Sequence, residues 1–264
     1  AGPSHTTGQL VKSFKEERHA ADVAQLDLWW NAGCKCWITG DRRGRLHFWD
    51  LRTSQNQLDE DVGDIHAVRV LTEHTRAVTA HLELGPHKFS TTSLDHRVII
   101  WSSQKEYSPD LIITDHEASV LSQAYLPHLS CLVTAGCEHI ARCWAVSPSG
   151  GFQGPRGRGR VEGHQANLVQ VVAGQRVCFT LDEAGTWFAW DGATLARLQF
   201  GSLVGMHPTS IACLGSLGRV CLAGRRFAFL EANAPLALAM GSKKASAADK
   251  QRALEEEASS FAKQ

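Results

Sequence analysis

Four tryptophans stand at nearly regular intervals in this chain of 264 residues, and a threonine precedes each of them by ten residues. Successive tryptophans are 52, 43 and 46 residues apart. The pairs are Thr39 with Trp49, Thr91 with Trp101, Thr134 with Trp144, and Thr180 with Trp190. A pitch of this length is typical of repeat proteins in which each repeat forms one supersecondary unit. The chain is therefore expected to consist of similar units placed one after another.

Short strand-like segments fill the repeats. AVTAHLEL, KFSTTSL, RVIIWS and DLIITD follow one another between residues 77 and 115, and later stretches show the same rhythm. These segments are rich in β-branched and aromatic residues and are separated by Gly, Asp, Asn or Pro. Since no helix is needed between them, parallel crossovers are disfavoured. The sequence predicts an all-β fold of four-stranded antiparallel units.

Histidines precede the units at a similar pitch, at His19, His74, His116, His164 and His207. Together with the threonines and tryptophans, this pattern resembles the WD-repeat β-propeller family over residues 9–240. In that family a His, a Ser or Thr, an Asp and the Trp form a hydrogen-bonded network that anchors a blade. The resemblance implies a β-propeller and a structural role for these side chains.

The complete set maps onto the sequence once, in the second unit. Its members are His74, Thr91, Asp95 and Trp101. In the third unit the corresponding residues are His116, Thr134, Glu138 and Trp144. The acid position is taken by Arg43 in the first unit and by Ala184 in the fourth. In these two units the family's threonine and tryptophan positions are matched by Thr39, Trp49, Thr180 and Trp190. The fifth unit keeps His207 but has Val220 and Leu230 where Thr and Trp would stand.

The expected organisation is a flexible N-terminus at 1–8, a propeller at 9–240 and a charged helical tail or linker at 241–264. The blades are expected at roughly 15–72, 73–115, 116–163, 164–206 and 207–240, with a lone outer strand at 9–14. About five blades fall short of the seven common in the family. The sequence is therefore interpreted as part of a larger (seven-blade or double) propeller, which a partner or further chain would complete. A small or irregular ring and undetected degenerate blades remain the alternatives.

Composition and motifs bear on the function. Lys plus Arg and Asp plus Glu number 27 each, so no overall field attracts nucleic acid or anionic lipid. There is no apolar run long enough to cross a bilayer, and most of the eight cysteines lie in strand-like segments, as buried thiols do in a reducing compartment. The prediction is an intracellular, cytoplasmic protein, with cytoskeletal, ciliary or nuclear placement left open.

No phosphate loop, Gly-x-Ser-x-Gly, His-Glu-x-x-His or Cys-x-x-Cys occurs, so no enzyme, cofactor or metal site is expected.

The favoured function is that of a non-catalytic scaffold for protein–protein interactions in a multiprotein complex. If the turns between second and third strands meet on one top face, as in the family, their basic residues would suit an acidic or phosphorylated peptide. These residues are Arg42, Arg43, His96, Arg97, His139, Arg225 and Arg226. The alternative for each of them is an ordinary solvated turn residue.

Two further functions remain open. The run Trp49-Asp50-Leu51-Arg52 resembles the ending found in WD-repeat substrate receptors of cullin-type ubiquitin ligases, in which Arg52 would contact the adaptor. The Gly-rich basic stretch 147–160, interpreted as a linker, would serve an RNA-associated role through the arginines of 156–160. Proteins are favoured over nucleic acid as partners of this chain, since the basic stretch lacks interleaved aromatic residues.

Overall fold

The computed structural model describes residues 24–50, 67–146, 157–174, 177–203, 209–214, 219–224 and 227–231. Within these ranges the protein is all-β, as predicted, apart from two single-turn 3₁₀ helices at Ser103–Lys105 and Pro127–Leu129. No helix in this part of the chain is long and apolar enough to span a membrane.

The strands form five antiparallel sheets, in which neighbours along the chain are neighbours in space. The first sheet contains β1 (Gln25–Asn31), β2 (Cys36–Asp41), β3 (Leu46–Trp49) and β4 (Arg69–Leu71). The second contains β5 (Val78–Gly85), β6 (Lys88–Ser93), β7 (Val98–Ser102) and β8 (Ser108–Ile113). The third contains β9 (Val120–Leu126), β10 (Cys131–Gly136), β11 (Ala141–Ala145) and β12 (Gly157–Val161). The fourth contains β13 (Leu168–Ala173), β14 (Val177–Asp182), β15 (Thr186–Asp191) and β16 (Arg197–Ser202), and the fifth β17 (Ser210–Leu214), β18 (Arg219–Ala223) and β19 (Phe227–Glu231).

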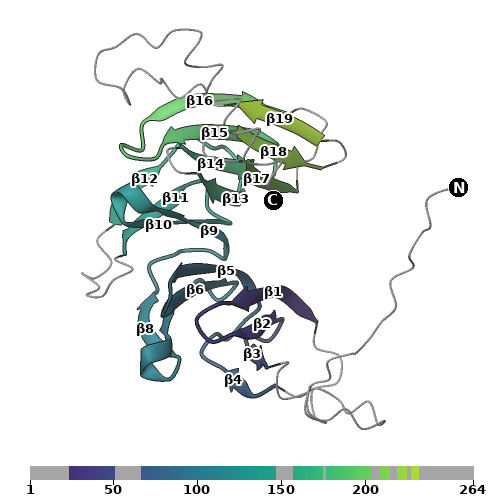
Figure 1. Ribbon diagram of the computed structural model, residues 1–264. Helices are drawn as coiled ribbons and strands as arrows, with labels where there is room; N and C mark the ends of the chain where they lie inside the picture. The colour runs from purple at the N-terminus through teal and green to yellow at the C-terminus, as the bar shows by residue number, and fades with distance from the viewer. Residues whose placement is uncertain are drawn as a thin grey trace, which may run out of the picture.

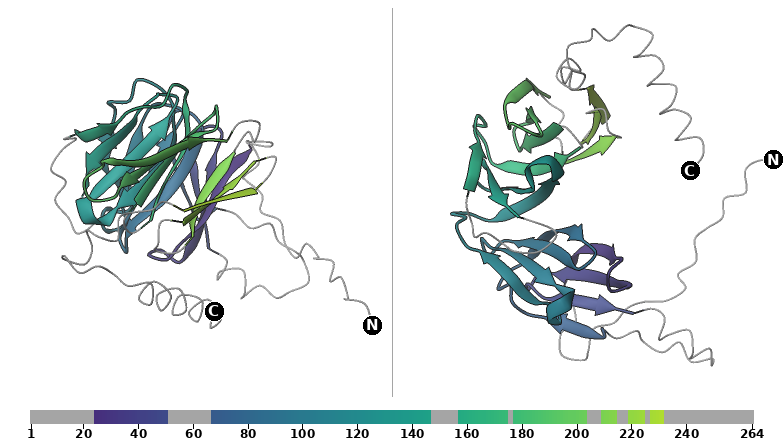
Figure 2. Two further views of the ribbon diagram at one scale, coloured as in Figure 1. Left: turned by 90° about the horizontal axis from the view of Figure 1, so that it is seen from above. Right: turned by 60° about the vertical axis from the view of Figure 1, so that its left-hand side comes forward.

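The five sheets follow one another along a curved row (Figure 1). The first strands, β1, β5, β9, β13 and β17, lie on the inner side of the curve, and each contacts the first strand of the next sheet. The outer strands β4, β8, β12 and β16 lie on the convex side. In the described part of the chain the row stays open, with the first and fifth sheets at its two ends (Figure 2).

The hydrophobic core is divided among the junctions between successive sheets. Between the first and second sheets, Ile38 and Phe48 pack with Phe89 and Trp101. Separate clusters fill the junctions from second to third, third to fourth and fourth to fifth sheets. The central strands are buried on both faces because a sheet lies on each side of them, which explains runs such as CLVTAG in β10.

The strand assignments made from the sequence hold for the segments that the structure describes, with one correction. The end of the stretch 147–160, interpreted as a linker, forms β12, which pairs with β11 from Ala141↔Val161 to Trp144↔Gly157. The glycines allow this because the register shifts between Cys143 and Trp144, and Gly159 takes a φ of +149°. The lone strand at 9–14, the final segment of the fifth unit and the tail 241–264 lie outside the described residues.

Candidate functional site

A chain of buried hydrogen bonds crosses the second sheet. Trp101 Nε1 donates to Thr91 Oγ1 at 2.8 Å, and Thr91 Oγ1 lies 2.9 Å from His74 Nε2. His74 Nδ1 lies 2.9 Å from Asp95 Oδ2. Since a carboxylate only accepts, Nδ1 carries the hydrogen, and in the neutral imidazole Nε2 accepts from the threonine hydroxyl. Each polar atom of this chain therefore has a partner of the right kind.

The carboxylate at the end of this chain also organises the turn. Asp95 accepts the backbone N–H groups of Thr75 and Arg97 at 2.9 and 3.0 Å. Burial alone raises the pKa of Asp95, but the hydrogen bond and charge of His74 and these backbone donors outweigh it, so the pKa lies below its usual value. The carboxylate thus ties the loop before the second sheet to the turn between β6 and β7.

The third sheet repeats the arrangement with a longer acid. Trp144 Nε1 donates to Thr134 Oγ1 at 2.7 Å, and His116 lies between that hydroxyl (3.0 Å) and Glu138 Oε1 (3.2 Å). Arg142 Nε donates to the second carboxylate oxygen of Glu138 at 2.7 Å. Burial opposes ionisation of Glu138, yet the bond from Arg142 and the charges of His116 and Arg142 keep its pKa below the usual value.

The fourth sheet corrects the prediction that its network lacks an acid. Trp190 Nε1 donates to Thr180 Oγ1 at 2.9 Å, and His164 Nε2 lies 2.7 Å from that hydroxyl. Asp182 Oδ2 then lies 2.8 Å from His164 Nδ1, so the acid is Asp182 and not the residue at 184. Asp182 ends β14 and reaches the histidine from the strand, whereas Asp95 and Glu138 reach theirs from the following turn.

The two end sheets differ from the inner three. In the first sheet Trp49 Nε1 donates to Thr39 Oγ1 at 3.0 Å, and His47 on β3 lies 3.1 Å from Asp41 Oδ2. Asp41, rather than Arg43, is therefore the acid here, and it also accepts Arg45 Nε at 2.8 Å.

In the fourth sheet Cys178 pairs with the closing Trp190, and the network Thr180 stands two residues after Cys178. In the fifth sheet Val220 pairs with Leu230, so the position equivalent to the threonine is Leu222 and not Val220. Leu222 has no hydroxyl, so the conclusion that this unit lacks the threonine is unchanged. The histidines at 19 and 207 lie outside the described residues.

Burial of two network histidines, His116 and His164, makes stability depend on pH. Burial lowers the pKa of His116 and His164 below the histidine reference value of about 6.5. The unfolded chain therefore binds more protons than the native state as the pH falls below that value. Each histidine contributes stability that is complete above about pH 6.5 and lost as the pH falls through its folded pKa, at no more than about 1.4 kcal/mol per pH unit.

We expect the free energy of unfolding, measured by denaturant titration, to fall between pH 7.5 and pH 5.5. His164→Gln should unfold more easily at pH 7.5 and show a shallower pH dependence, because one of the titrating groups is gone. His139→Gln removes an exposed imidazole and should leave the dependence in place. Equal slopes for all three proteins would contradict the assignment.

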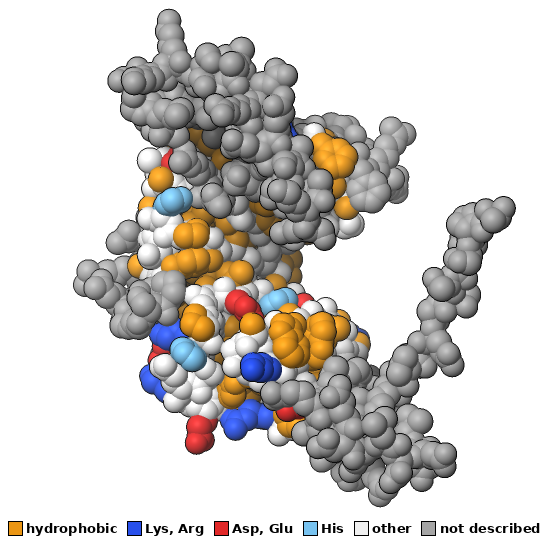
Figure 3. All heavy atoms as spheres, viewed as in Figure 1, with side chains coloured by type: hydrophobic (Ala, Val, Ile, Leu, Met, Phe, Trp, Pro, Cys, Tyr) orange, Lys and Arg blue, Asp and Glu red, His pale blue; other side chains and the backbone are white. Residues whose placement is uncertain are grey.

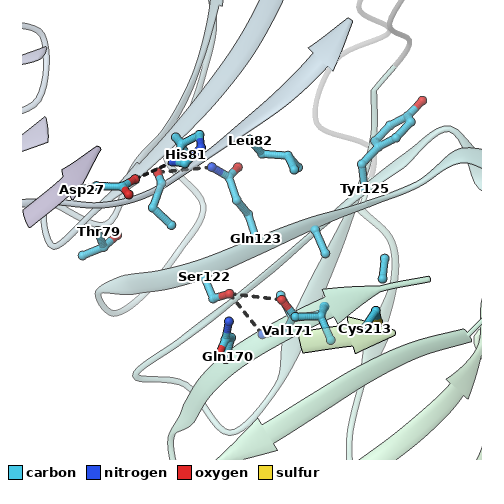
Figure 4. A pocket seen from close by; sticks show the side chains of 14 residues that line it. Asp27, Thr79, His81, Leu82, Ser122, Gln123, Tyr125, Gln170, Val171 and Cys213 are labelled. Atoms are coloured by element: carbon cyan, nitrogen blue, oxygen red, sulfur yellow. Dashed lines mark hydrogen bonds and ion pairs between the residues drawn. The ribbon is translucent and has the colours of Figure 1, made fainter. Parts of the chain in front are cut away.

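A groove of about 460 Å³ runs along the inner strands, where residues of β1, β5, β9, β13 and β17 meet (Figure 4). Its polar side chains join one sheet to the next. Asp27 Oδ2 lies 2.7 Å from His81 Nδ1, and Ser122 Oγ exchanges hydrogen bonds with the backbone of Val171. Gln123 spans the junction to the second sheet through Ser90. The groove is therefore built chiefly from contacts that hold the row together.

Sequence reasoning did not find these inner-strand residues. Asp27, His81, Ser122 and Gln123 differ in chemistry from one sheet to the next, so they leave no repeating signal. The two acids that the sequence analysis missed, Asp41 and Asp182, did leave a repeating signal. Each stands two residues after the threonine of its unit, in TGD and TLD.

The turns between second and third strands lie at one rim of the row. Gly44, in the β2–β3 turn, approaches the carbonyl groups of His74 and Arg76 so closely that a Cβ there would lie 2.5 and 2.7 Å from their oxygens. Ser119, before β9, donates to Leu94 O in the β6–β7 turn at 3.2 Å. Adjacent rim turns therefore touch one another through the loops that carry the network histidines.

The structure places the predicted basic residues unevenly on this rim. Arg42 and Arg43 are exposed on the first sheet, His96 and Arg97 are half-buried on the second, and His139 is exposed on the third. Arg76 is also exposed, in the loop that contacts the first two turns, and Glu73 lies nearby in the chain. The third and fourth sheets instead carry exposed acidic residues, namely Asp115, Glu117, Glu162 and Glu183. Among the rim residues that the structure describes, the exposed arginines thus lie on the turns of the first two sheets and in the loop that contacts them.

The remaining predicted contacts are described only in part. Arg52, Arg225 and Arg226 lie outside the described residues. Trp49, which opens the Trp-Asp-Leu-Arg run, is buried and bonded to Thr39. In the basic stretch Arg160 is exposed on β12, while 147–156 lie outside the described residues. Within the described ranges no group of three or more His, Cys, Asp or Glu side chains is placed to hold a metal ion.

Comparison with known proteins leaves this geometry as the main guide to function. No family model matches the sequence, and a search of curated proteins finds no significant match.

Proposed function

We propose that this chain is a non-catalytic scaffold of the WD-repeat β-propeller type, which holds other proteins within an intracellular multiprotein complex. The observation that carries the proposal is the repeated Trp–Thr–His–acid network of the second, third and fourth sheets. A Thr–His–Asp set in one place would suggest a nucleophile and its base. Three buried copies, each closed by a tryptophan, suggest instead that this chemistry holds strands together.

The rim of the first two sheets is the surface that we propose for partner binding. Arg42, Arg43 and Arg76 are exposed, and Arg97 lies in the adjoining turn. Guanidinium groups gathered on neighbouring turns favour carboxylates or phosphates, to which arginine can donate two parallel hydrogen bonds. We therefore propose an acidic or phosphorylated peptide as the ligand of this rim.

Charge reversal on this rim tests the proposal. The triple variant Arg42→Glu, Arg43→Glu, Arg97→Glu should bind an array of acidic and phosphorylated peptides at least about tenfold more weakly than the original chain, because attraction becomes repulsion. Lys35→Glu changes an exposed cation in the turn between β1 and β2, at the other end of the first sheet, and should leave binding intact. Binding should also weaken as salt is raised.

Fluorescence anisotropy with labelled peptides measures these affinities. Affinity that is unchanged in the triple variant, or absent for all peptides in the original chain, would contradict the assignment of this rim. Unfolding midpoints of the variants show whether any loss of binding comes from loss of structure.

A further inference from the structure

Cys34 and Cys36 are the two cysteines that lie closest together in the sequence, with only Lys35 between them. Cys34 lies in the turn between β1 and β2, and Cys36 is the first residue of β2, at the end of the first sheet away from the rim. Cys34 is half-buried, and Cys36 is 8% exposed. Neither the hydrogen-bonded networks nor the rim proposed for partner binding uses these thiols.

Contacts with the second sheet set the shape of this turn. The backbone N–H of Ala32 donates to Glu83 Oε1, at the end of β5, at 3.2 Å. Gly33 approaches the turn between β5 and β6 so closely that a Cβ there would lie 2.3 Å from Pro86 O. The two cysteines therefore stand on a turn that is held from both sides, by its own strands and by the next sheet.

The backbone of Lys35 brings the two cysteines together. Its φ is +55°, and at that φ the allowed conformation of a residue with a side chain is the left-handed helical one. A helical residue of either hand holds the Cα atoms on its two sides about 5.4 Å apart, from the radius, twist and rise of the helix. A strand residue would hold them about 6.7 Å apart. Disulfides are most frequent at Cα separations of about 5.5–6 Å, so the turn favours a bond between these cysteines.

The two thiols also lie near the same side chain. Tyr107, just before β8, packs on Phe48 in the core between the first and second sheets, with ring centroids 4.9 Å apart. Burial, the charge and hydrogen bond of Cys34, and the charge of Cys36 together raise the pKa of Tyr107 to about 12. Because both thiols are close to one phenol oxygen, they are close to each other, and the side chains converge as the backbone does.

Other cysteines of the described chain provide a contrast. Burial raises the pKa of Cys178, and a hydrogen bond with Cys131 together with burial raises that of Cys143. These thiols do not readily form the thiolate, which is the reactive species. Cys137 is exposed, but the nearest cysteines along the chain are six residues away from it. Cys34 differs from all of these because it is partly accessible and has a second thiol two residues away.

We propose that Cys34 and Cys36 are a thiol-oxidation site, at which exchange with glutathione disulfide forms a reversible Cys34–Cys36 disulfide. The thiolate of Cys34, the more accessible of the two, attacks one sulfur of glutathione disulfide and releases the first glutathione. The thiolate of Cys36 then attacks Cys34 Sγ and releases the second glutathione. Two electrons pass from the cysteine pair to glutathione disulfide, and the two cysteine protons end on the two glutathione thiols.

The surroundings of the turn suit this reagent. Glutathione disulfide is negatively charged at neutral pH, while Lys35 is exposed and the guanidinium carbon of Arg69 lies 5.4 Å from the ring centroid of Tyr107. Among the coloured side chains of Figure 3, those of Lys and Arg lie mainly over the lower part of the row, where the first and second sheets are. A disulfide that closes so short a loop constrains the unfolded chain little, so excess glutathione should reduce it again. This inference does not depend on the proposed scaffold function.

Mass spectrometry of the folded full chain tests the inference, because trypsin cleaves after Lys35, between the two cysteines. The chain is incubated with glutathione disulfide at pH 7.5, its remaining thiols are alkylated, and it is then digested. We expect the peptides 19–35 and 36–42 to be recovered mainly as one disulfide-joined product, and to separate after incubation with excess glutathione. In Cys36→Ser the exchange should stop at its first step, with glutathione attached to Cys34.

Cys137 is the matched control, because it is exposed and should take up one glutathione in the same sample. Cys143 and Cys178 should be alkylated only after the chain is denatured. Recovery of Cys34 and Cys36 as alkylated thiols from the folded chain would overturn the inference, and glutathione on Cys137 shows that the reagent was active. A bridge from Cys34 to any other cysteine, or a joined product that forms only in denaturant, would overturn it as well.

Discussion

Replacing Asp182 with alanine is expected to lower the free energy of unfolding by about 2–6 kcal/mol, because two buried donors lose their acceptor and each unsatisfied group costs about 1–3 kcal/mol. Asp182 is 1% exposed and lies 2.8 Å from His164 Nδ1. It also accepts the backbone N–H of Thr186 at 2.7 Å. Alanine would leave both donors buried without an acceptor. Denaturant unfolding at pH 7.5 measures the loss.

The neighbouring residues supply a control and a rescue for this variant. Glu183→Ala removes an exposed carboxylate and should change the stability by less than about 0.5 kcal/mol. Ala184 stands where the second and third sheets have Asp95 and Glu138, which reach their histidines from the turn. Asp182→Ala combined with Ala184→Asp should therefore recover part of the lost stability. A single variant as stable as the original chain would refute the role given to Asp182.

Replacing Thr91 with valine is expected to lower the free energy of unfolding by about 2–6 kcal/mol, since valine keeps the shape but removes the hydroxyl. Two buried groups lose their partner, namely Trp101 Nε1 at 2.8 Å and His74 Nε2 at 2.9 Å. Each such unsatisfied group costs about 1–3 kcal/mol. Thr75→Val makes the same chemical change at an exposed position and should be nearly neutral.

Two measurements distinguish the loss of these hydrogen bonds from a loss of side-chain packing in Thr91→Val. The unfolding midpoint gives the total cost, and the indole N–H resonance of Trp101 should shift in Thr91→Val because its acceptor is gone. A change below about 0.5 kcal/mol, with the resonance unmoved, would show that the threonine does not link histidine and tryptophan.

The strands and the Thr–Trp spacing could be predicted from the sequence because they depend on local alternation and on a repeated length. The acids of the first and fourth sheets were missed because the offset of the second and third sheets, four residues after the threonine, does not hold there, and Asp41 and Asp182 stand two residues after it. Asp182 and Asp95 reach the histidine from different backbone positions, and only the folded chain brings either position to the imidazole. β12 was missed for a related reason, since Gly157–Val161 has little strand propensity and pairs because β11 offers it an edge.

The divided core has a consequence for how the protein loses structure. A row in which each sheet packs on its sequence neighbours behaves as a nearly one-dimensional array, whose stability is a sum of unit and junction contributions. Cooperativity in such an array is limited, and opening begins at the weakest terminal unit. The fifth sheet has a leucine at the threonine position and, in the described part of the chain, a single neighbouring sheet. Its amide hydrogens should exchange first, and the protected region should then shrink sheet by sheet toward the middle of the row.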